Sequence, residues 1–423
     1  MNTSEGYPLV LDRPTNAHDK RWLIDYGEKD GVRTFRRFHP MLYQMLNHNA
    51  ELRSEGIVPL TIFSDTLKDC RLPKEKVLVP GKTRIFSCCP LEYTLAVKKE
   101  FGVFQMSFLN RMFFNENAIG VNCNSFAWTE LVDYLGQVSL KNCIVGDYKA
   151  FGDTLQPEVV FGCFNLIQDW YYLHFKEPFS VEKDVMAYEA AHAKRIALNY
   201  LYQTVCGIPS GFPLTVEMNS MVNSIYMRVC WILIGKDNGV VATMRDFNRY
   251  VRIVTYGDDI IMSVAPGYEW FNFNSISKKL AEFNISFTSA DKDRKNVPDY
   301  LPIEECTFLK RNFIRHPFRK NVWLGALPKQ SIEESVSWVW KGNDPDAAIF
   351  EAARACLEGA FGHGPNYYEE VRDTMTNRIA VELHQQWHSN SWIELDQLIF
   401  DDKIVVSSWN GFSGEDEIFG TSE

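Results

Sequence analysis

The sequence lacks the signals of a metal-cluster protein, a secreted protein or a membrane protein. Its ten cysteines include no Cys-x-x-Cys spacing, which argues against a structural zinc site and a disulfide framework. Apolar stretches such as Val159–Leu166 and Val229–Gly235 are far shorter than the roughly 20 residues of a membrane helix. The start, Met1–Gly6, is polar and no apolar segment follows it, so we expect no signal peptide and a cytosolic location.

A surplus of basic charge is also missing. The chain has 44 Lys and Arg against 54 Asp and Glu, a net charge of −10, which argues mildly against nucleic-acid binding. The charge is unevenly spread, however, and the acidic excess includes the tail Phe412–Glu423. One short basic stretch therefore remains compatible with phosphate binding; it contains Lys68, Arg71, Lys74, Lys76, Lys82 and Arg84.

Length and hydrophobic periodicity predict a mixed protein of more than one subdomain. A chain of 423 residues is too long for one compact core. A mainly helical region, 331–392 with a break at 359–365, follows a core that mixes helices and strands. We therefore expect an α+β core with a separate helical layer. The predicted helices are 91–109, 156–175, 181–204, 215–234 and 273–283; the predicted strands are 142–148, 306–313 and 321–324, with a hairpin at 252–264.

Paired carboxylates stand at the tip of the predicted hairpin. Asp258 and Asp259 follow Tyr256-Gly257, between two β-branched, apolar arms. An ordinary solvated Gly-Asp turn is one explanation. The alternative is a cation site, because two adjacent like charges repel and a bound cation relieves that repulsion.

A third carboxylate, Asp147, ends the apolar strand at 142–148. Alone it is explained as a strand-end cap. If this strand lies beside the hairpin, Asp147, Asp258 and Asp259 converge at one end of a sheet. Three such oxygen donors could hold two Mg²⁺ ions about 3.5–4 Å apart, an arrangement suited to in-line phosphoryl transfer.

A Gly/Pro loop, Cys206–Pro213, leads into the helix predicted at 215–234. Ser210 lies in this loop, and Thr215, Asn219 and Asn223 recur every four residues along one helical face. Hydroxyls and free N–H groups at a helix start can meet a ribose or a phosphate. An N-cap followed by surface amides is the alternative.

Taken in chain order, these segments resemble the motif set of picornavirus-like RNA polymerases, over residues 3–340. The form of motif A is similar to that of iflavirus- or dicistrovirus-like relatives. The corresponding segments are Thr3–Pro8 (motif G), Lys68–Arg84 (F), Asp147–Leu155 (A), Ser210–Asn223 (B), Tyr256–Asp259 (C), Ala290–Lys292 (D) and Thr307–Arg311 (E).

The resemblance implies a right-hand polymerase fold, with an antiparallel-sheet palm, fingers and a helical thumb. It implies fingers at 1–90 with motifs G and F, palm at 91–162 with motif A, a fingers insertion at 163–209, palm again at 210–314, and a thumb with C-terminal tail at 315–423.

The resemblance also implies a role for each matching residue. Asp147, Asp258 and Asp259 would be catalytic and would hold Mg²⁺, with Mn²⁺ as a substitute, while Lys292 would protonate the leaving pyrophosphate. The alternative for Lys292 is a surface lysine. Nucleotide binding would fall to Lys68, Lys76, Lys82, Arg84, Asp153, Ser210, Thr215 and Asn219, and RNA or primer binding to Ser4, Gly6, Lys310 and Arg311.

Two departures from the family pattern stand out. Picornaviruses carry a second motif A aspartate five residues after the metal ligand; here that position is Gly152, and Asp153 follows it. Either Asp153 takes over contact with the sugar, or Asn219 reads it largely alone. The family also has a longer segment before motif G, so we expect this chain to lack the N-terminal part of the fingers.

The resemblance implies an RNA-directed RNA polymerase that replicates a positive-strand RNA virus genome. Its partners would be RNA template and primer, ribonucleoside triphosphates, a small genome-linked protein primer and other viral replication proteins. Its place would be the host cytoplasm, at membrane-bound replication complexes. Two alternatives are an RNA-binding fragment, inactive without its N-terminal segment, and a reverse transcriptase.

Overall fold

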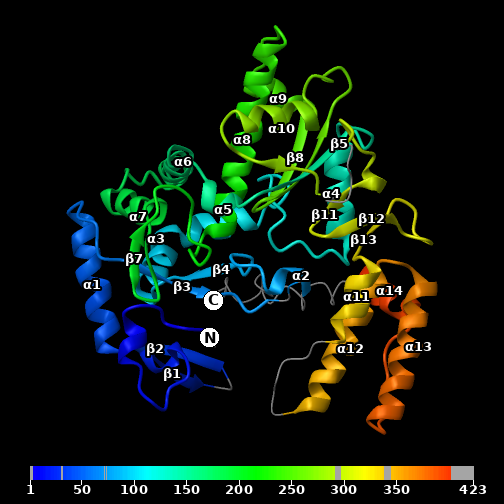
Figure 1. Cartoon of the computed structure of the whole chain (residues 1–423), viewed down its shortest axis with the longest axis horizontal. Coiled ribbons are helices and arrows are strands. Elements are labelled where there is room, and N and C mark those ends of the chain that lie inside the picture. The colour runs from blue at the N-terminus through cyan, green and yellow to red at the C-terminus, as the bar shows by residue number, and fades with distance from the viewer. Residues whose placement is uncertain are drawn as a thin grey trace, which may run out of the picture. The chain divides into compact units, whose positions relative to one another are not determined.

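The computed structural model describes residues 3–29, 32–70, 72, 74–290, 297–337 and 344–401 (Figure 1). These residues fall into two compact units. Unit 1 takes its residues from Met1–Arg111, Tyr148–Tyr226 and Tyr256–Asp258. Unit 2 takes its residues from Met112–Asp147, Met227–Thr255 and Asp259–Glu423. The chain therefore passes between the units several times.

Unit 1 is built around a four-stranded sheet in the order β4-β3-β6-β7. β3 pairs antiparallel with β4 and parallel with β6, and β6 forms an antiparallel hairpin with β7. A second hairpin, β1–β2, precedes it in the chain. The strands are β1 (Ile24–Lys29), β2 (Val32–Phe38), β3 (Ile62–Leu67), β4 (Ile85–Cys88), β6 (Lys194–Ala197) and β7 (Tyr200–Gln203).

Helices complete unit 1. Pro40 and Pro157 occupy first-turn positions, where proline removes no hydrogen bond, and they start α1 and α6. The helices are η1 (Leu9–Asp12), η2 (Lys20–Leu23), α1 (Pro40–Ser54), α2 (Lys74–Val77), α3 (Leu91–Leu109), α5 (Phe151–Thr154), α6 (Pro157–Phe175), α7 (Val181–Ala191) and the first part of α8 (Thr215–Asp237).

A buried ion cluster ties the helices of unit 1 together. The guanidinium of Arg53 on α1 has no exposed surface; it donates to Glu92 on α3 at 2.8 Å and to Glu189 on α7 at 2.8 Å. Thr61 also donates to Glu189. Burial raises the pKa of Glu189, although its hydrogen bonds with Arg53 and Thr61 oppose that rise.

Unit 2 contains a second four-stranded sheet, in the order β10-β5-β9-β8. β5 pairs antiparallel with β9, from Cys143 opposite Ser263 to Gly146 opposite Ile260. Capping boxes start α9 at Thr243 and α10 at Asn272. The elements are α4 (Phe126–Gly136), β5 (Cys143–Tyr148), the rest of α8, α9 (Met244–Tyr250), β8 (Val251–Tyr256), β9 (Asp259–Val264), α10 (Phe273–Ala281) and β10 (Phe287–Thr288).

The C-terminal part of unit 2 consists of a three-stranded sheet and packed helices, drawn in yellow to red in Figure 1. Apolar side chains of α11, α12, α13 and α14 share one core around Phe361 and Trp392, whose rings stack 5.3 Å apart. The elements are η3 (Ile303–Glu305), β11 (Thr307–Phe308), β12 (Arg311–Arg315), β13 (Trp323–Ala326), α11 (Lys329–Ser335), α12 (Pro345–Phe361), α13 (Pro365–Glu382) and α14 (Trp392–Phe400).

Most of the predicted elements are confirmed. The helix predicted at 91–109 matches α3, and the hairpin at 252–264 matches β8 and β9. The helix predicted at 181–204 is wrong, since α7 ends at Ala191 and the chain then forms the β6–β7 hairpin. Pairing of β6 with β3 outweighs the helical composition of this stretch. No helix of the described residues is long and apolar enough to span a membrane.

Replacing Arg53 by Met should destabilise unit 1, because it leaves the carboxylates of Glu92 and Glu189 buried without their cation. Breaking a buried ion pair typically costs about 3–5 kcal/mol. Urea unfolding at pH 7, followed by circular dichroism, measures this loss. The loss should shrink at pH 5, because the raised pKa of Glu189 allows its carboxyl to take up a proton.

The matched control is Arg33→Met on the exposed strand β2, which should leave the unfolding midpoint almost unchanged. Equal unfolding midpoints for both variants would mean that the Arg53 cluster does not stabilise the fold.

Candidate active site

In unit 2, strand pairing brings two of the predicted carboxylates to one end of the sheet. Gly146 of β5 lies opposite Ile260 of β9, so the next residues, Asp147 and Asp259, stand at the same sheet end. Both are partly exposed. The strand that carries Asp147 therefore lies beside the hairpin, as the predicted convergence of the carboxylates requires.

In unit 1, helix α8 holds the turn that carries Asp258. The side-chain amide of Asn223 is fully buried and donates to the carbonyls of Gly257 at 3.1 Å and Asp258 at 3.3 Å. Ser220 Oγ accepts from the Gly257 N–H at 2.9 Å, and Asn223 Oδ1 accepts from the hydroxyl of Tyr148 at 2.9 Å. The turn is thus fixed by side chains, while Asp258 itself is exposed.

The chemistry of these donors fits a hard divalent cation. Carboxylate oxygens are the protein ligands that Mg²⁺ prefers. Asp258 and Asp259 are consecutive, and Asp147 ends the strand beside β9. Among the described residues, however, no three His, Cys, Asp or Glu side chains are grouped so as to hold a metal ion.

The loop before α8 packs closely on the end of β4. A Cβ atom on Gly211 would lie 2.1 Å from the carbonyl oxygen of Ser87, so only glycine fits. Ser210 Oγ accepts from the Ser87 N–H at 3.1 Å. Thr215 turns its hydroxyl back onto the carbonyls of Pro209 and Phe212, at 2.9 and 2.6 Å. The structure therefore joins the motif B loop to β4, the strand that directly follows the basic segment.

The same loop is bonded to α5. Gly207 has φ of +83°, and a Cβ there would lie 2.7 Å from the carbonyl oxygen of Gly152. The Ile208 N–H donates to that carbonyl at 2.8 Å. Asn219 lies nearby, since a Cβ on Gly152 would be 3.8 Å from its Nδ2. Asn219 Oδ1 is buried and accepts no hydrogen bond from any described residue, so it can receive a ligand hydroxyl.

The basic segment presents its cations to solvent. Lys68 precedes α2 and bonds through its N–H to the carbonyl of Arg84 at 2.8 Å, which extends the β3–β4 pairing. The side chains of Lys68, Lys82 and Arg84 are exposed. These cations lie in the connection between the paired strands β3 and β4, and lysine and arginine can form charge-assisted hydrogen bonds with a phosphate. The side chain of Lys76 lies outside the described residues.

The buried carboxylate of Glu5 anchors the motif G segment through hydrogen bonds. Glu5 is fully buried and accepts from Arg13 Nε at 2.8 Å and from Trp22 Nε1 at 2.9 Å. Burial alone would raise the pKa of Glu5, but these hydrogen bonds hold it below its ordinary value. Ser4 Oγ accepts from the Gly6 N–H at 3.1 Å, and Ser4 remains exposed.

The two cations of the motif E hairpin, Lys310 and Arg311, have different surroundings. Leu309 and Lys310 both have left-handed backbone angles in the tight turn between β11 and β12, which leaves Lys310 exposed at the tip. Arg311 instead donates to the carbonyl of Gly325 at 2.6 Å and to Asn124 at 3.3 Å. Burial lowers the pKa of its guanidinium. Lys292 lies outside the described residues.

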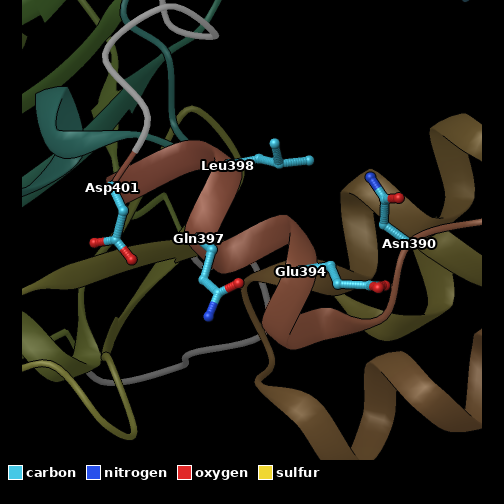
Figure 2. Close-up of a pocket in the computed structure, with 5 residues that line it drawn as sticks. All are labelled: Asn390, Glu394, Gln397, Leu398 and Asp401. Carbon is cyan, nitrogen blue, oxygen red and sulfur yellow. The ribbon is translucent and has the colours of Figure 1, made fainter.

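An open pocket of about 580 Å³ lies in unit 2, along α14 and the segment just before it (Figure 2). Asn390, Glu394, Gln397, Leu398 and Asp401 line it. None of these residues was predicted to be functional, and the lining offers acids and amides but no cation. This pocket is therefore not suited to a triphosphate.

The fold is that of right-hand polymerases. The structure superposes on the Sicinivirus 3Dpol RNA-dependent RNA polymerase with a TM-score of 0.73, over 94% of this chain and 76% of that one, at 23% identity. The prediction of an α+β right-hand polymerase is thereby confirmed.

The family model described as viral RNA-dependent RNA polymerase matches residues 1–378, and the chain belongs to this family. It is 35% identical over 382 residues to the genome polyprotein of Deformed wing virus, covering 88% of this chain. It is 28% identical over 401 residues to the replicase polyprotein of Drosophila C virus, covering 92% of this chain. The predicted resemblance to iflavirus- or dicistrovirus-like polymerases is confirmed. The chain spans only 13% and 22% of the length of these polyproteins.

Several residues that shape this region were missed by the sequence prediction. Ser87 and Tyr148 act through hydrogen bonds to segments distant in the sequence, and no local pattern reveals such partners. Arg195 was hidden by the wrong helix prediction for 181–204. The leucine-asparagine turn that joins β6 to β7 is the feature of the sequence that could have indicated this hairpin, and with it the position of Arg195.

Replacing Gly211 by Ala should destabilise the protein by about 1–3 kcal/mol, because the new methyl group would overlap the Ser87 carbonyl. Thermal unfolding followed by circular dichroism measures the loss. Gly162→Ala on α6 is the control: no atom lies within 4 Å of its added Cβ, and alanine favours the helix. Equal melting temperatures for the two variants would contradict the close approach.

Proposed function

We propose that this chain is an RNA-directed RNA polymerase that replicates the genome of a positive-strand RNA virus. The reaction is addition of a ribonucleoside monophosphate to the 3′-end of a primer, with release of pyrophosphate. One observation carries the proposal: helix α8 fixes the Asp258 turn through Asn223 and Ser220, while the loop before α8 is bonded to Ser87 on β4, the strand that directly follows the basic segment. A carboxylate turn and a phosphate-binding segment are thus supported by one element.

Asp147, Asp258 and Asp259 are the proposed metal ligands, with Mg²⁺ as the ion and Mn²⁺ as a substitute. Bound Mg²⁺ supplies charge neutralisation for the triphosphate and lowers the pKa of the attacking 3′-hydroxyl. The protein contributes the fixed carboxylates: strand pairing positions Asp147 and Asp259, and Asn223 positions the turn at Asp258.

The remaining roles are those that the resemblance to picornavirus-like polymerases implies for each motif. Lys68, Lys76, Lys82 and Arg84 neutralise the incoming triphosphate, and Lys292 protonates the leaving pyrophosphate. Asn219, with Ser210, Thr215 and Asp153, tests the ribose for its 2′-hydroxyl. The Oδ1 of Asn219 is buried and has no hydrogen-bond partner among the described residues, which supports this role. Ser4 and Gly6 contact template RNA, and Lys310 and Arg311 contact the primer strand.

The proposed domain assignment is fingers at 1–90 and 163–209, palm at 91–162 and 210–314, and thumb at 315–423.

The proposed partners of this chain are RNA template and primer, ribonucleoside triphosphates, a small genome-linked protein that primes synthesis, and other viral replication proteins. Its proposed location is the host cytoplasm, at membrane-bound replication complexes.

Primer extension on an RNA template with Mg²⁺ and ribonucleoside triphosphates tests the proposal. The wild-type chain should extend the primer, and Asp258→Ala should reduce the rate by about 10³-fold or more, since a metal ligand supplies several kcal/mol of transition-state stabilisation. Asp169→Ala on the exposed face of α6 is the matched control and should retain wild-type activity.

Other outcomes would replace the proposal with a named alternative. RNA binding without extension by either protein would favour the RNA-binding fragment, since binding does not need Asp258. Preference for deoxyribonucleotides would favour a reverse transcriptase. Equal extension by wild type and Asp258→Ala would remove Asp258 from the catalytic assignment.

A further inference from the structure

Arg195 on β6 is a buried cation whose hydrogen-bonding capacity is not filled. The residue is 7% exposed, and its Nε donates to no atom of the described residues. Burying a guanidinium donor without an acceptor is unfavourable, so such a group usually has a purpose beyond packing. β6 is an inner strand of the unit 1 sheet, which fixes the backbone of Arg195 between β3 and β7.

The nearest acid to this guanidinium is Asp153 on α5. Arg195 Nη1 lies 4.0 Å from Asp153 Oδ1, the outer limit of an ion pair. The backbone of Asp153 is fixed, because the Gly207 Cα sits so close that a Cβ there would be 2.9 Å from the Asp153 Cα. Its carboxylate is 75% exposed and therefore accessible to a ligand.

Asp153 stands one residue after Gly152, where an added Cβ would lie 3.8 Å from Nδ2 of Asn219, so Gly152 and Asn219 are neighbours. Asn219 Oδ1 is the second buried polar atom of unit 1 that lacks a partner among the described residues. A sugar hydroxyl is both donor and acceptor, and it can satisfy this oxygen while approaching a carboxylate on the Gly152 side.

A hydrogen-bond network connects Arg195 to the loop before α8. Tyr202 on β7 lies beside the Arg195 guanidinium and donates to Asp65 on β3. Asp65 also accepts from Ser87 Oγ at 2.6 Å. The Ser87 N–H in turn donates to Ser210. The position of Arg195 is thus coupled to the loop that carries the nucleotide-binding serine.

We propose that Arg195 is a positioning residue for ribose selection, which holds the Asp153 carboxylate beside Gly152 so that it can accept a hydrogen bond from the 2′-hydroxyl. This inference rests on the proposed polymerase function. A long ion pair whose carboxylate is exposed, and which has no such role, would add little to stability and nothing to substrate choice. The two explanations therefore differ in what removal of the pair does to sugar discrimination.

The experiment measures kcat/KM for a ribonucleoside triphosphate and for the matching deoxyribonucleotide, in primer extension by the full chain with Mg²⁺. Arg195→Gln, Asp153→Asn and the double variant are compared with wild type, and Arg33→Gln on exposed β2 is the control. Each single variant should lower the ribose preference by about 10-fold, the size of one hydrogen bond to a charged group. The double variant should lower it no further, because the two residues act as one unit.

A different pattern would overturn the inference. Equal loss of activity on both nucleotides with an unchanged ratio would mean that Arg195 supports only the fold, and so would additive effects in the double variant. Should Arg195→Gln not fold, Asp153→Asn alone decides, since its side chain is exposed: an unchanged ratio refutes the proposal. Absence of extension by the wild-type chain would instead refute the proposed function itself.

Discussion

The close approach of the Cys206–Pro213 loop to two neighbouring backbones is the constraint on which the candidate site of unit 1 depends. Gly207 meets the carbonyl of Gly152, and Gly211 meets the carbonyl of Ser87, at distances that exclude any side chain. These approaches place the start of α8 against both α5 and β4. Asn219 and Asn223, further along α8, then take positions that no local preference of their own would fix.

Polar side chains of α8 then determine which atoms of the candidate site are held by hydrogen bonds. Asn223 satisfies its three hydrogen bonds inside unit 1 and stiffens the turn beside Asp258. Asn219, one helical turn earlier, has a buried Oδ1 that accepts no hydrogen bond from the described residues. Buried polar atoms are normally paired, so the contrast separates a structural amide from one that we propose receives a ligand. A similar contrast distinguishes Arg53, whose guanidinium donates to two acids, from Arg195, whose Nε donates to no atom in the described part of the chain.

Sequence prediction succeeded where local pattern and final structure agree. The apolar strand ending at Asp147 and the Asp258 hairpin were both expected, because β-branched runs with a Gly-Asp turn have few other solutions. It failed at 181–204, where helix-forming residues continue past Ala191 but the backbone joins a sheet. The β1–β2 hairpin was likewise not expected, since β2 is almost entirely exposed and carries no clear alternation of apolar and polar residues.

The sequence by itself determined the class of fold, the carboxylates at Asp147 and Asp258–Asp259, and the basic segment near Lys82, because each depends on residues close together in the chain. Only the tertiary structure decided which of these face one another. Pairing of β5 with β9 aligns Asp147 with Asp259, and the packing of unit 1 places Arg195 on β6 4.0 Å from Asp153 on α5. Such pairings depend on the free energy of packing between segments distant in sequence, which no local pattern encodes.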